Sequence, residues 1–218
     1  MRRHDLITLK PDVQPQSVGC CTTDGATHVV REWIAAGRPF VYARQTSASP
    51  LLGLGAAIVI DGTKHRVSVM VRPQDLLRVE APHRLNDCLP LFSNDDAMVL
   101  RCLIDGLSVG GHQLRVFGSV AWELISDQSY RTSDSDLDLL CDVQTVCDIE
   151  IVTRLLYLAE RCLSFRLDGE LRFANGYAVN WREAAAALDH AEMLEVLVKS
   201  ESGVHMTTLS QCQEMIHA

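Results

Sequence analysis

The sequence of 218 residues predicts an α+β protein in two parts: a smaller α+β domain, then a core in which helices pack on a mixed sheet. Two observations predict this class. Runs that alternate apolar and polar residues, typical of strands, are interspersed with runs whose apolar residues recur at helical spacing. In the second half their order is strand, helix, acidic strand, long helix and strand. We place the boundary near Ser93, so that residues 1–92 form the first domain and residues 93–218 the second.

The first domain is predicted to combine one helix with several strands. Residues 27–36 carry an apolar stripe at helical spacing and are followed by Gly37, which favours a helix end. Residues 52–60 and 65–71 flank Asp61-Gly62, a pair that favours a tight hairpin turn. Three further segments are expected to be an entry segment, a strand and a connection: residues 2–9, 40–44 and 79–90. We expect a scaffold, with docking of a protein substrate as the alternative role.

The second domain contains stronger start and stop signals. Ser93 is a suitable N-cap for a helix, and Asn175-Gly176 is typical of a two-residue hairpin turn. Residues 163–173 alternate strictly, so one face of that strand is apolar and the other charged. The remaining predictions are helices over residues 93–103, 143–162 and 181–188, a loop over 106–111, a final strand over 195–199 and a helix from about residue 210.

The most informative stretch, LRVFGSVAWELISDQSYRTSDSDLDLL, spans residues 114–140. A short apolar strand leads into Gly118 and Ser119, and a segment of helical character follows. Gly118 has no Cβ, so a phosphate can approach the backbone closely. Ser119 is expected at the helix start, where free N–H groups and the positive end of the helix dipole attract anions. We therefore predict that Gly118 and Ser119 bind phosphate.

The acidic strand that ends this stretch predicts a metal site. Side chains alternate along a strand, so Asp136 and Asp138 share one face while Leu137 and Leu139 share the other. Two carboxylates roughly 7 Å apart suit Mg²⁺, which binds one or two carboxylates and completes its shell with water and substrate phosphates. A phosphate cradle followed by a metal pair favours phosphoryl or nucleotidyl transfer, with Asp136 and Asp138 as the catalytic residues.

Each of these features also has an ordinary structural interpretation. Gly-Ser pairs are common in turns, and Asp-rich runs are common in solvated loops. The combination favours a site, because carboxylates on an otherwise apolar strand are costly to bury unless they are paired or bind metal. In the strand over residues 163–173, Asp168 and Glu170 share the charged face. They are either part of an exposed, charge-balanced face or further ligands.

Together these motifs resemble the phosphoribosyl-dephospho-CoA transferase family, also called malonate decarboxylase holo-acyl-carrier-protein synthase. Matching pieces are HDL at residues 4–6, GRP at 37–39, the stretch from Arg115 to Leu140, and DGELRFANGYAVNWRE at 168–183. An apolar residue, Gly-Ser, a spacer and Asp-x-Asp also resemble the DNA polymerase β-like nucleotidyltransferase superfamily, although the spacer is long for it. The resemblance implies a polymerase-β-like nucleotidyltransferase core, Mg²⁺ as cofactor, and a third carboxylate, Asp168 or Glu170.

The family resemblance also implies substrates. The donor is 2'-(5''-triphosphoribosyl)-3'-dephospho-CoA, and the acceptor is a serine of the apo acyl-carrier subunit of malonate decarboxylase, with pyrophosphate released. Arg115, Arg131 or Arg154 is a candidate for contacting the triphosphate, because arginine forks suit phosphate oxygens. Because carrier proteins are usually acidic, docking requires a local basic patch, for which Arg31, Arg78 and Arg84 are candidates.

Composition excludes other classes of protein. A net charge of −8 argues against a general nucleic-acid binder. No apolar stretch is long enough to span a membrane and no signal peptide is recognised, so we expect a cytoplasmic protein with reduced thiols at its eight scattered cysteines. The histidines form no zinc motif.

Two alternatives remain open from the sequence. The same site could transfer a nucleotidyl group to a small hydroxyl compound or to another protein. The chain could also be a catalytically silent module that binds the carrier protein. Retention of Gly118, Ser119 and the Asp136/Asp138 pair argues against a silent module.

Overall fold

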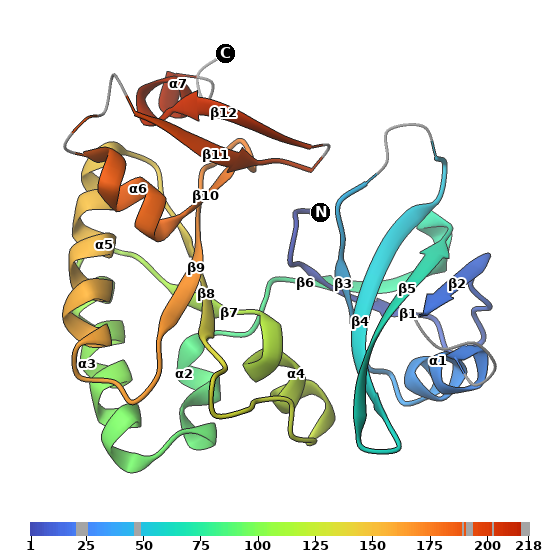
Figure 1. The fold of residues 1–218 in the computed structure, drawn as a ribbon. Helices are drawn as coiled ribbons and strands as arrows, with labels where there is room; N and C mark the ends of the chain where they lie inside the picture. The colour runs from blue at the N-terminus through green and yellow to red at the C-terminus, as the bar shows by residue number, and fades with distance from the viewer. Residues whose placement is uncertain (21–25, 46–48, 189, 191–193, 202, 215–218) are drawn as a thin grey trace. The chain divides into compact units, whose positions relative to one another are not determined.

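The computed structural model describes residues 1–20, 26–45, 49–188, 190, 194–201 and 203–214. The chain divides into two compact units, the first made of Met1–Pro82 with Ile125–Tyr130 and the second of His83–Leu124 with Arg131–Ala218 (Figure 1). Helices and two sheets are present, as the predicted α+β class requires. No helix in the described part of the chain is long and apolar enough to cross a membrane.

The first unit is built on a six-stranded antiparallel sheet with the order β2-β5-β4-β3-β1-β6. The predicted hairpin is confirmed: Asp61 (φ 49°) and Gly62 (φ 75°) both have the left-handed conformation that a two-residue turn requires. Val67, Val69 and Val71 are buried on one face of β5, as alternation predicts. The elements are β1 (Leu6–Leu9), β2 (Ser17–Cys20), α1 (Ala26–Ala35), β3 (Phe40–Tyr42), β4 (Leu52–Ile60), β5 (Thr63–Val71), the 3-10 helix η1 (Pro73–Asp75) and β6 (Leu76–Glu80).

The second unit is built on a six-stranded mixed sheet with the order β12-β11-β10-β9-β8-β7. β8 and β9 are parallel, and the other neighbours are antiparallel. A parallel pair requires a crossover, which α5 supplies. The elements are α2 (Leu85–Cys88), η2 (Leu89–Leu91), α3 (Asn94–Val109), β7 (Leu114–Val116), α4 (Gly118–Ser126), β8 (Leu137–Asp142), α5 (Val146–Glu160), β9 (Leu167–Arg172), β10 (Ala178–Asn180), α6 (Trp181–Leu188), β11 (Glu195–Lys199), β12 (Val204–Thr208) and α7 (Leu209–Glu214).

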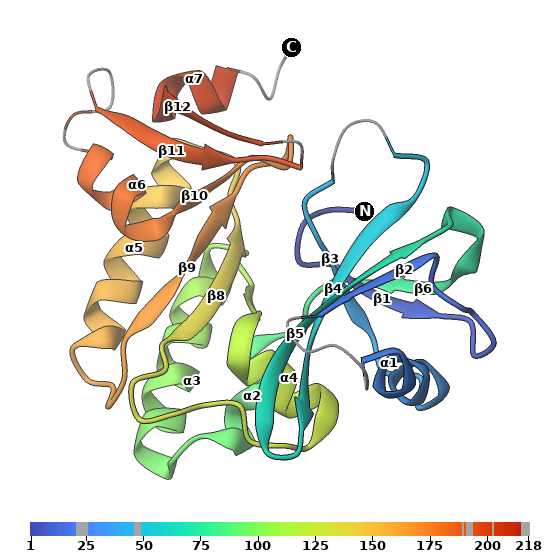
Figure 2. The same cartoon turned by 45° about the vertical axis from the view of Figure 1, so that its right-hand side comes forward.

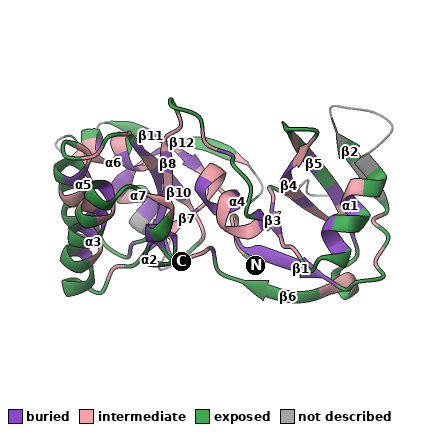
Figure 3. Cartoon of the chain, turned by 90° about the horizontal axis from the view of Figure 1, so that it is seen from below, coloured by how far each residue is buried: buried purple, intermediate pink, exposed green. Residues whose placement is uncertain are grey.

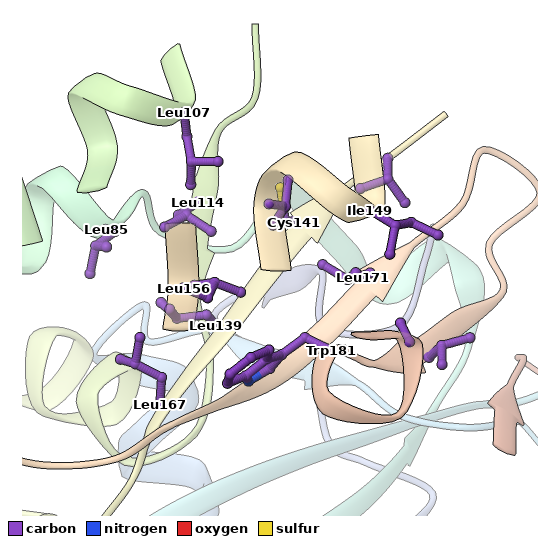
Figure 4. Packing of buried hydrophobic residues seen from close by; sticks show 14 of the residues in the cluster. Leu85, Leu107, Leu114, Leu139, Cys141, Ile149, Leu156, Leu167, Leu171 and Trp181 are labelled. Carbon is purple, nitrogen blue, oxygen red and sulfur yellow. The ribbon is translucent and has the colours of Figure 1, made fainter. Parts of the chain in front are cut away.

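The core of the second unit lies between its sheet and the helices α3 and α5. Apolar side chains of β8 and β9 pack with those of the helices, among them Leu139, Leu171, Ile149 and Leu156 (Figure 4). The two helices lie side by side along these strands (Figures 1 and 2), and their outer sides are exposed (Figure 3). One face of the central strands is therefore covered by helices, so polar side chains that β8 and β9 direct to the other face can form a site.

Capping residues start the two long helices. The Ser93 side chain accepts a hydrogen bond from Asp96 N at 3.2 Å, which satisfies one free N–H of α3 and confirms the predicted cap. Thr145 and Asp148 form a capping box at the start of α5. The sequence predicted a helix that ends near Leu103, but α3 continues into the predicted loop and ends at Val109. At Gly106, inside this helix, an added Cβ would lie 3.6 Å from Cδ1 of Leu155 on α5, which is ordinary van der Waals contact.

The division between units differs from the boundary expected near Ser93. Leu85, Cys88 and Leu89, which were expected in connecting structure, are buried in the core of the second unit. The chain also leaves the second unit after Leu124 and returns to it at Arg131. Within the first unit, the Tyr130 hydroxyl donates a hydrogen bond of 2.9 Å to the carbonyl of Ala57. The spacer between Ser119 and Asp136 is thus long because part of it, Ile125–Tyr130, belongs to the first unit.

Candidate active site

The site is built around Gly118, where β7 ends and α4 begins. The Phe117 N–H donates to the Asp138 carbonyl at 3.1 Å, which brings Gly118 next to the start of β8. Gly118 has φ +67°, a conformation that side chains other than glycine rarely adopt. A Cβ on this residue would lie 1.8 Å from Oδ2 of Asp138. Glycine is therefore required for both the backbone conformation and the close approach of the Asp138 carboxylate.

The helix that follows places Ser119 in its first turn. α4 spans nine residues, Gly118–Ser126, and is anchored by Val120, Ala121 and Trp122, which are buried. Its first N–H groups have no partner within the helix, so the helix start carries a positive partial charge beside Asp138. A phosphate group would be stabilised by this helix start.

The carboxylates from β8 and β9 lie in neighbouring strands at matching positions. Asp138 on β8 is the register partner of Asp168 on β9, and adjacent strands are about 4.8 Å apart. Both side chains are half-buried. Asp136 lies immediately before β8, two residues from Asp138, and the following residue, Leu137, donates its N–H to the Arg166 carbonyl at 2.9 Å. The three predicted acids thus come from adjoining strand ends.

Asp168 and Glu170, which the sequence did not separate, have different surroundings. Glu170 is 5% exposed and pairs with the Lys199 ammonium, whose Nζ lies 2.8 Å from Oε1. Asp168 instead accepts a hydrogen bond of 2.8 Å from the neutral amide of Asn180. The positive charge of Lys199 therefore compensates the charge of Glu170, whereas the neutral amide of Asn180 does not compensate that of Asp168. Lys199 thus pairs with a carboxylate of its own sheet.

The donor set suits a magnesium ion only in a limited way. Carboxylate oxygens are the ligands that Mg²⁺ prefers, and Asp138 and Asp168 are register partners. Among the described residues, however, no three histidine, cysteine, aspartate or glutamate side chains gather as a metal cluster. The residues present therefore fit an ion that takes one or two protein carboxylates and completes its shell with water and substrate phosphates.

Comparison with known proteins places the chain in a family. Two family models match: the N-terminal domain of phosphoribosyl-dephospho-CoA transferase MdcG over residues 2–82, and its C-terminal domain over residues 85–210. The chain belongs to the phosphoribosyl-dephospho-CoA transferase family. It is thus a transferase, and the boundary between the two family domains falls near Pro82, where the structural units also divide.

Individual relatives support this membership over most of the chain. A phosphoribosyl-dephospho-CoA transferase of Xanthomonas euvesicatoria pv. vesicatoria (strain 85-10) is 35% identical over 202 residues, which cover 91% of this chain and 90% of the relative. The protein of that name from Bradyrhizobium diazoefficiens (strain JCM 10833 / BCRC 13528 / IAM 13628 / NBRC 14792 / USDA 110) is 28% identical over 207 residues, covering 91% and 86%. No solved structure matches the chain significantly.

The arginines that flank the site in sequence are dispersed in the structure of this transferase. Arg131 is held by Glu123, with Nε 2.8 Å from Oε2, and donates to the Leu91 carbonyl at 2.7 Å. Arg115 lines a polar cavity with His112 and Gln113, at the opposite end of β7 from Gly118. Arg154 is exposed on α5. Arg131 therefore stabilises the chain before the acidic strand.

Two residues near the carboxylates were not singled out from the sequence. Asn180 contacts Asp168 through its side-chain amide. Arg166, expected only as part of a charge-balanced face, is exposed and immediately precedes β9 beside Asp136. Strand alternation places Arg166 on the same face as Asp168, but it gives Arg166 no role in the site. Nothing in the sequence identified Asn180, because its contact depends on how β10 returns along β9.

The buried thiols of the transferase have no catalytic environment. Burial raises the pKa of Cys88 and of Cys141 to about 12, and the pKa of Cys212 to about 11. A nucleophilic cysteine requires a thiolate and hence a lowered pKa. These three cysteines are core residues. Cys102, Cys147 and Cys162 are exposed.

Proposed function

We propose that this transferase moves the phosphoribosyl-dephospho-CoA group from 2'-(5''-triphosphoribosyl)-3'-dephospho-CoA to a serine of the apo acyl-carrier subunit of malonate decarboxylase. The family supplies the transferred group, and the site supplies what such a transfer requires. The observation that carries the proposal is that Asp138 is the register partner of Asp168 and approaches Gly118 where any side chain would clash. A helix start and paired carboxylates are thereby brought together, as in phosphoryl transfer generally.

In the proposed reaction the serine Oγ forms a bond to the α-phosphorus of the donor. The bond from that phosphorus to the bridging oxygen breaks, and pyrophosphate leaves with the electron pair. Gly118 and Ser119 would hold the leaving pyrophosphate at the start of α4. The serine proton passes to the carboxylate of Asp168, which is the third carboxylate in this proposal. A phosphodiester then joins the carrier to the prosthetic group.

Asp138 and Asp168 are the residues that would hold Mg²⁺, with Asp136 at the adjoining strand end as a further carboxylate, as the resemblance to polymerase β-like nucleotidyltransferases implies. When bound, Mg²⁺ neutralises developing charge on the phosphate oxygens and lowers the pKa of a coordinated hydroxyl. Asp138 is fixed by the junction at Gly118, and Asp168 by Asn180. The protein thus holds two carboxylates in place for a cation that would neutralise the charge of the triphosphate.

A comparison of donors tests this proposal. Purified protein is incubated with Mg²⁺, apo carrier subunit and either the triphosphoribosyl donor or a nucleoside triphosphate, and pyrophosphate release is measured. We expect release only with the triphosphoribosyl donor, and its loss in Asp138→Asn. Asp134→Asn, an exposed residue of the same acidic run, is the matched control and keeps the rate. A nucleoside triphosphate that outperforms the proposed donor would instead assign the site to general nucleotidyl transfer.

A further inference from the structure

We propose that Asn180 is the residue that positions Asp168 in the active site. This inference rests on the proposed function, because it matters only if Asp168 serves the reaction. Asn180 is the last residue of β10 and is followed directly by α6. Its register partner on β9 is Glu170, so its side chain reaches along the neighbouring strand to Asp168.

Both ends of the Asn180 side chain are committed to different partners. The amide Nδ2 donates to Oδ1 of Asp168 at 2.8 Å, while Oδ1 accepts the N–H of Arg182 at 2.9 Å. Exchanging the amide nitrogen and oxygen would set two acceptors against each other at Asp168 and two donors at Arg182. The start of α6 therefore fixes the direction in which the Asn180 amide donates.

The neutral amide provides orientation without neutralising the carboxylate. Lys199, which pairs with Glu170, adds a positive charge to that carboxylate, whereas Asn180 occupies only one oxygen of Asp168 and adds no charge. The second oxygen stays available for a cation or a proton. Partners that orient ligating carboxylates are typically worth about 10–100-fold in metal affinity or activity. Asn180 is accordingly a positioning residue, since it acts through Asp168.

Two substitutions separate the donor role of Asn180 from its role at the start of α6. Asn180→Asp keeps an acceptor for the Arg182 N–H but has no amide to donate. Asn180→Ser keeps a short hydroxyl acceptor, adds no charge and is too short to reach Asp168. The matched control is Asn175→Ser, because Asn175 only accepts from the Tyr177 N–H at 3.0 Å, in the hairpin between β9 and β10.

The test measures Mn²⁺ binding by electron paramagnetic resonance, together with carrier modification at varied carrier concentration. We expect Asn180→Ser to raise the Mn²⁺ dissociation constant and to lower kcat by about 10–100-fold each, with an unchanged KM for the carrier. Asn180→Asp is expected to lower kcat, because it sets a second carboxylate against that of Asp168 and has no amide to donate. Asn175→Ser is expected to match wild type. Wild-type Mn²⁺ affinity and kcat in Asn180→Ser would overturn the inference, as would equal losses in Asn175→Ser.

The outcomes also separate this inference from the proposed reaction. Mn²⁺ binding that depends on Asn180 in a protein unable to modify the carrier would support the positioning role and reject the reaction. Carrier modification that is unaffected by both Asn180 substitutions would support the reaction and reject the positioning role. A wild-type protein that neither binds Mn²⁺ nor modifies the carrier would reject both.

Discussion

Replacing Gly118 with alanine should inactivate the enzyme by displacing one carboxylate. The added Cβ would lie 1.8 Å from Oδ2 of Asp138, whereas ordinary contact begins at 3.4 Å, so the oxygen must retreat by about 1.6 Å. A misplacement of about 1 Å in a catalytic group can cost 100-fold in rate. We therefore expect kcat for carrier modification to fall at least about 100-fold in Gly118→Ala.

The same substitution also strains the backbone, and a control must remove that effect. A left-handed residue other than glycine costs roughly 1–2 kcal/mol, which corresponds to about 2–8 °C in melting temperature for a chain of this size. Gly111→Ala provides the control: Gly111 has φ +78°, and nothing lies within 4 Å of the position that its Cβ would take. Both variants should lose the stability that this backbone strain costs, and only Gly118→Ala should lose activity.

Measurements of melting temperature and of initial rate on the two variants show whether displacement of Asp138 or backbone strain causes the loss of activity. If Gly118→Ala keeps a rate within about threefold of Gly111→Ala, the Asp138 carboxylate is not held in place by this junction for catalysis. Equal loss of rate in both variants would mean that backbone strain, and not displacement of Asp138, causes the defect.

Three further predictions follow from individual contacts. Asp168→Asn should lower kcat about 10–1,000-fold with little change in stability. Glu170→Gln should instead lower the free energy of unfolding, measured by urea titration, by about 1–3 kcal/mol, because it leaves the Lys199 charge without its partner. The reverse pattern would exchange the roles of the two carboxylates. Asp96 is buried, which raises its pKa, but hydrogen bonds from Ser164 and Ser93 outweigh this and lower the pKa below its usual value. A pKa that is lower in the folded than in the unfolded state stabilises the protein at pH values above the unfolded-state pKa of about 3.9, and this stabilisation is lost as the pH falls through the folded-state pKa. Ser164→Ala should therefore lower the free energy of unfolding by about 1.5–3 kcal/mol at pH 7, and by progressively less below about pH 4. A constant difference across this range would reject that origin. In mass-spectrometric thiol labelling of the folded protein at pH 8, Cys88, Cys141 and Cys212 should react only after unfolding. Among the cysteines whose exposure the structure describes, Cys102, Cys147 and Cys162 should react at once. Rapid labelling of Cys141 would show that the core of the second unit opens.

Local signals in the sequence were sufficient for much of the fold. The turn at Asp61-Gly62, the cap at Ser93 and the helix opened by Trp181 were all predicted, because each depends on residues close together in the chain. β1, β2, β6 and β12 were not predicted as strands. β2, β6 and β12 lie at sheet edges, where pairing with a neighbour decides the structure, and β1 is a strand of only four residues in what was expected to be an entry segment.

The residues of the candidate site could be predicted where they are close together in the sequence, but not where packing between distant strands determines their surroundings. Gly118, Ser119, Asp136 and Asp138 could be selected because a glycine between strand and helix and an alternating acidic strand are local patterns. The choice between Asp168 and Glu170 could not be made, since it depends on Lys199 and Asn180 across neighbouring strands.

The arginines near the motif show the limit of sequence proximity. Arg131 follows the motif helix closely, yet its guanidinium is occupied by Glu123 and a backbone carbonyl. Arg166 is distant from the motif in sequence but precedes β9 beside Asp136. Proximity along the chain does not predict which cation lies near a site assembled from parallel strands.

The mass of the apo acyl-carrier subunit after incubation with the enzyme, Mg²⁺ and the triphosphoribosyl donor tests the central claim most directly. We predict an increase equal to one phosphoribosyl-dephospho-CoA group with wild type, and no increase with folded Asp136→Ala or Asp138→Ala. A carrier left unmodified by folded wild-type enzyme would contradict the proposed reaction. Modification that survives both substitutions would show that the active site lies elsewhere in the molecule.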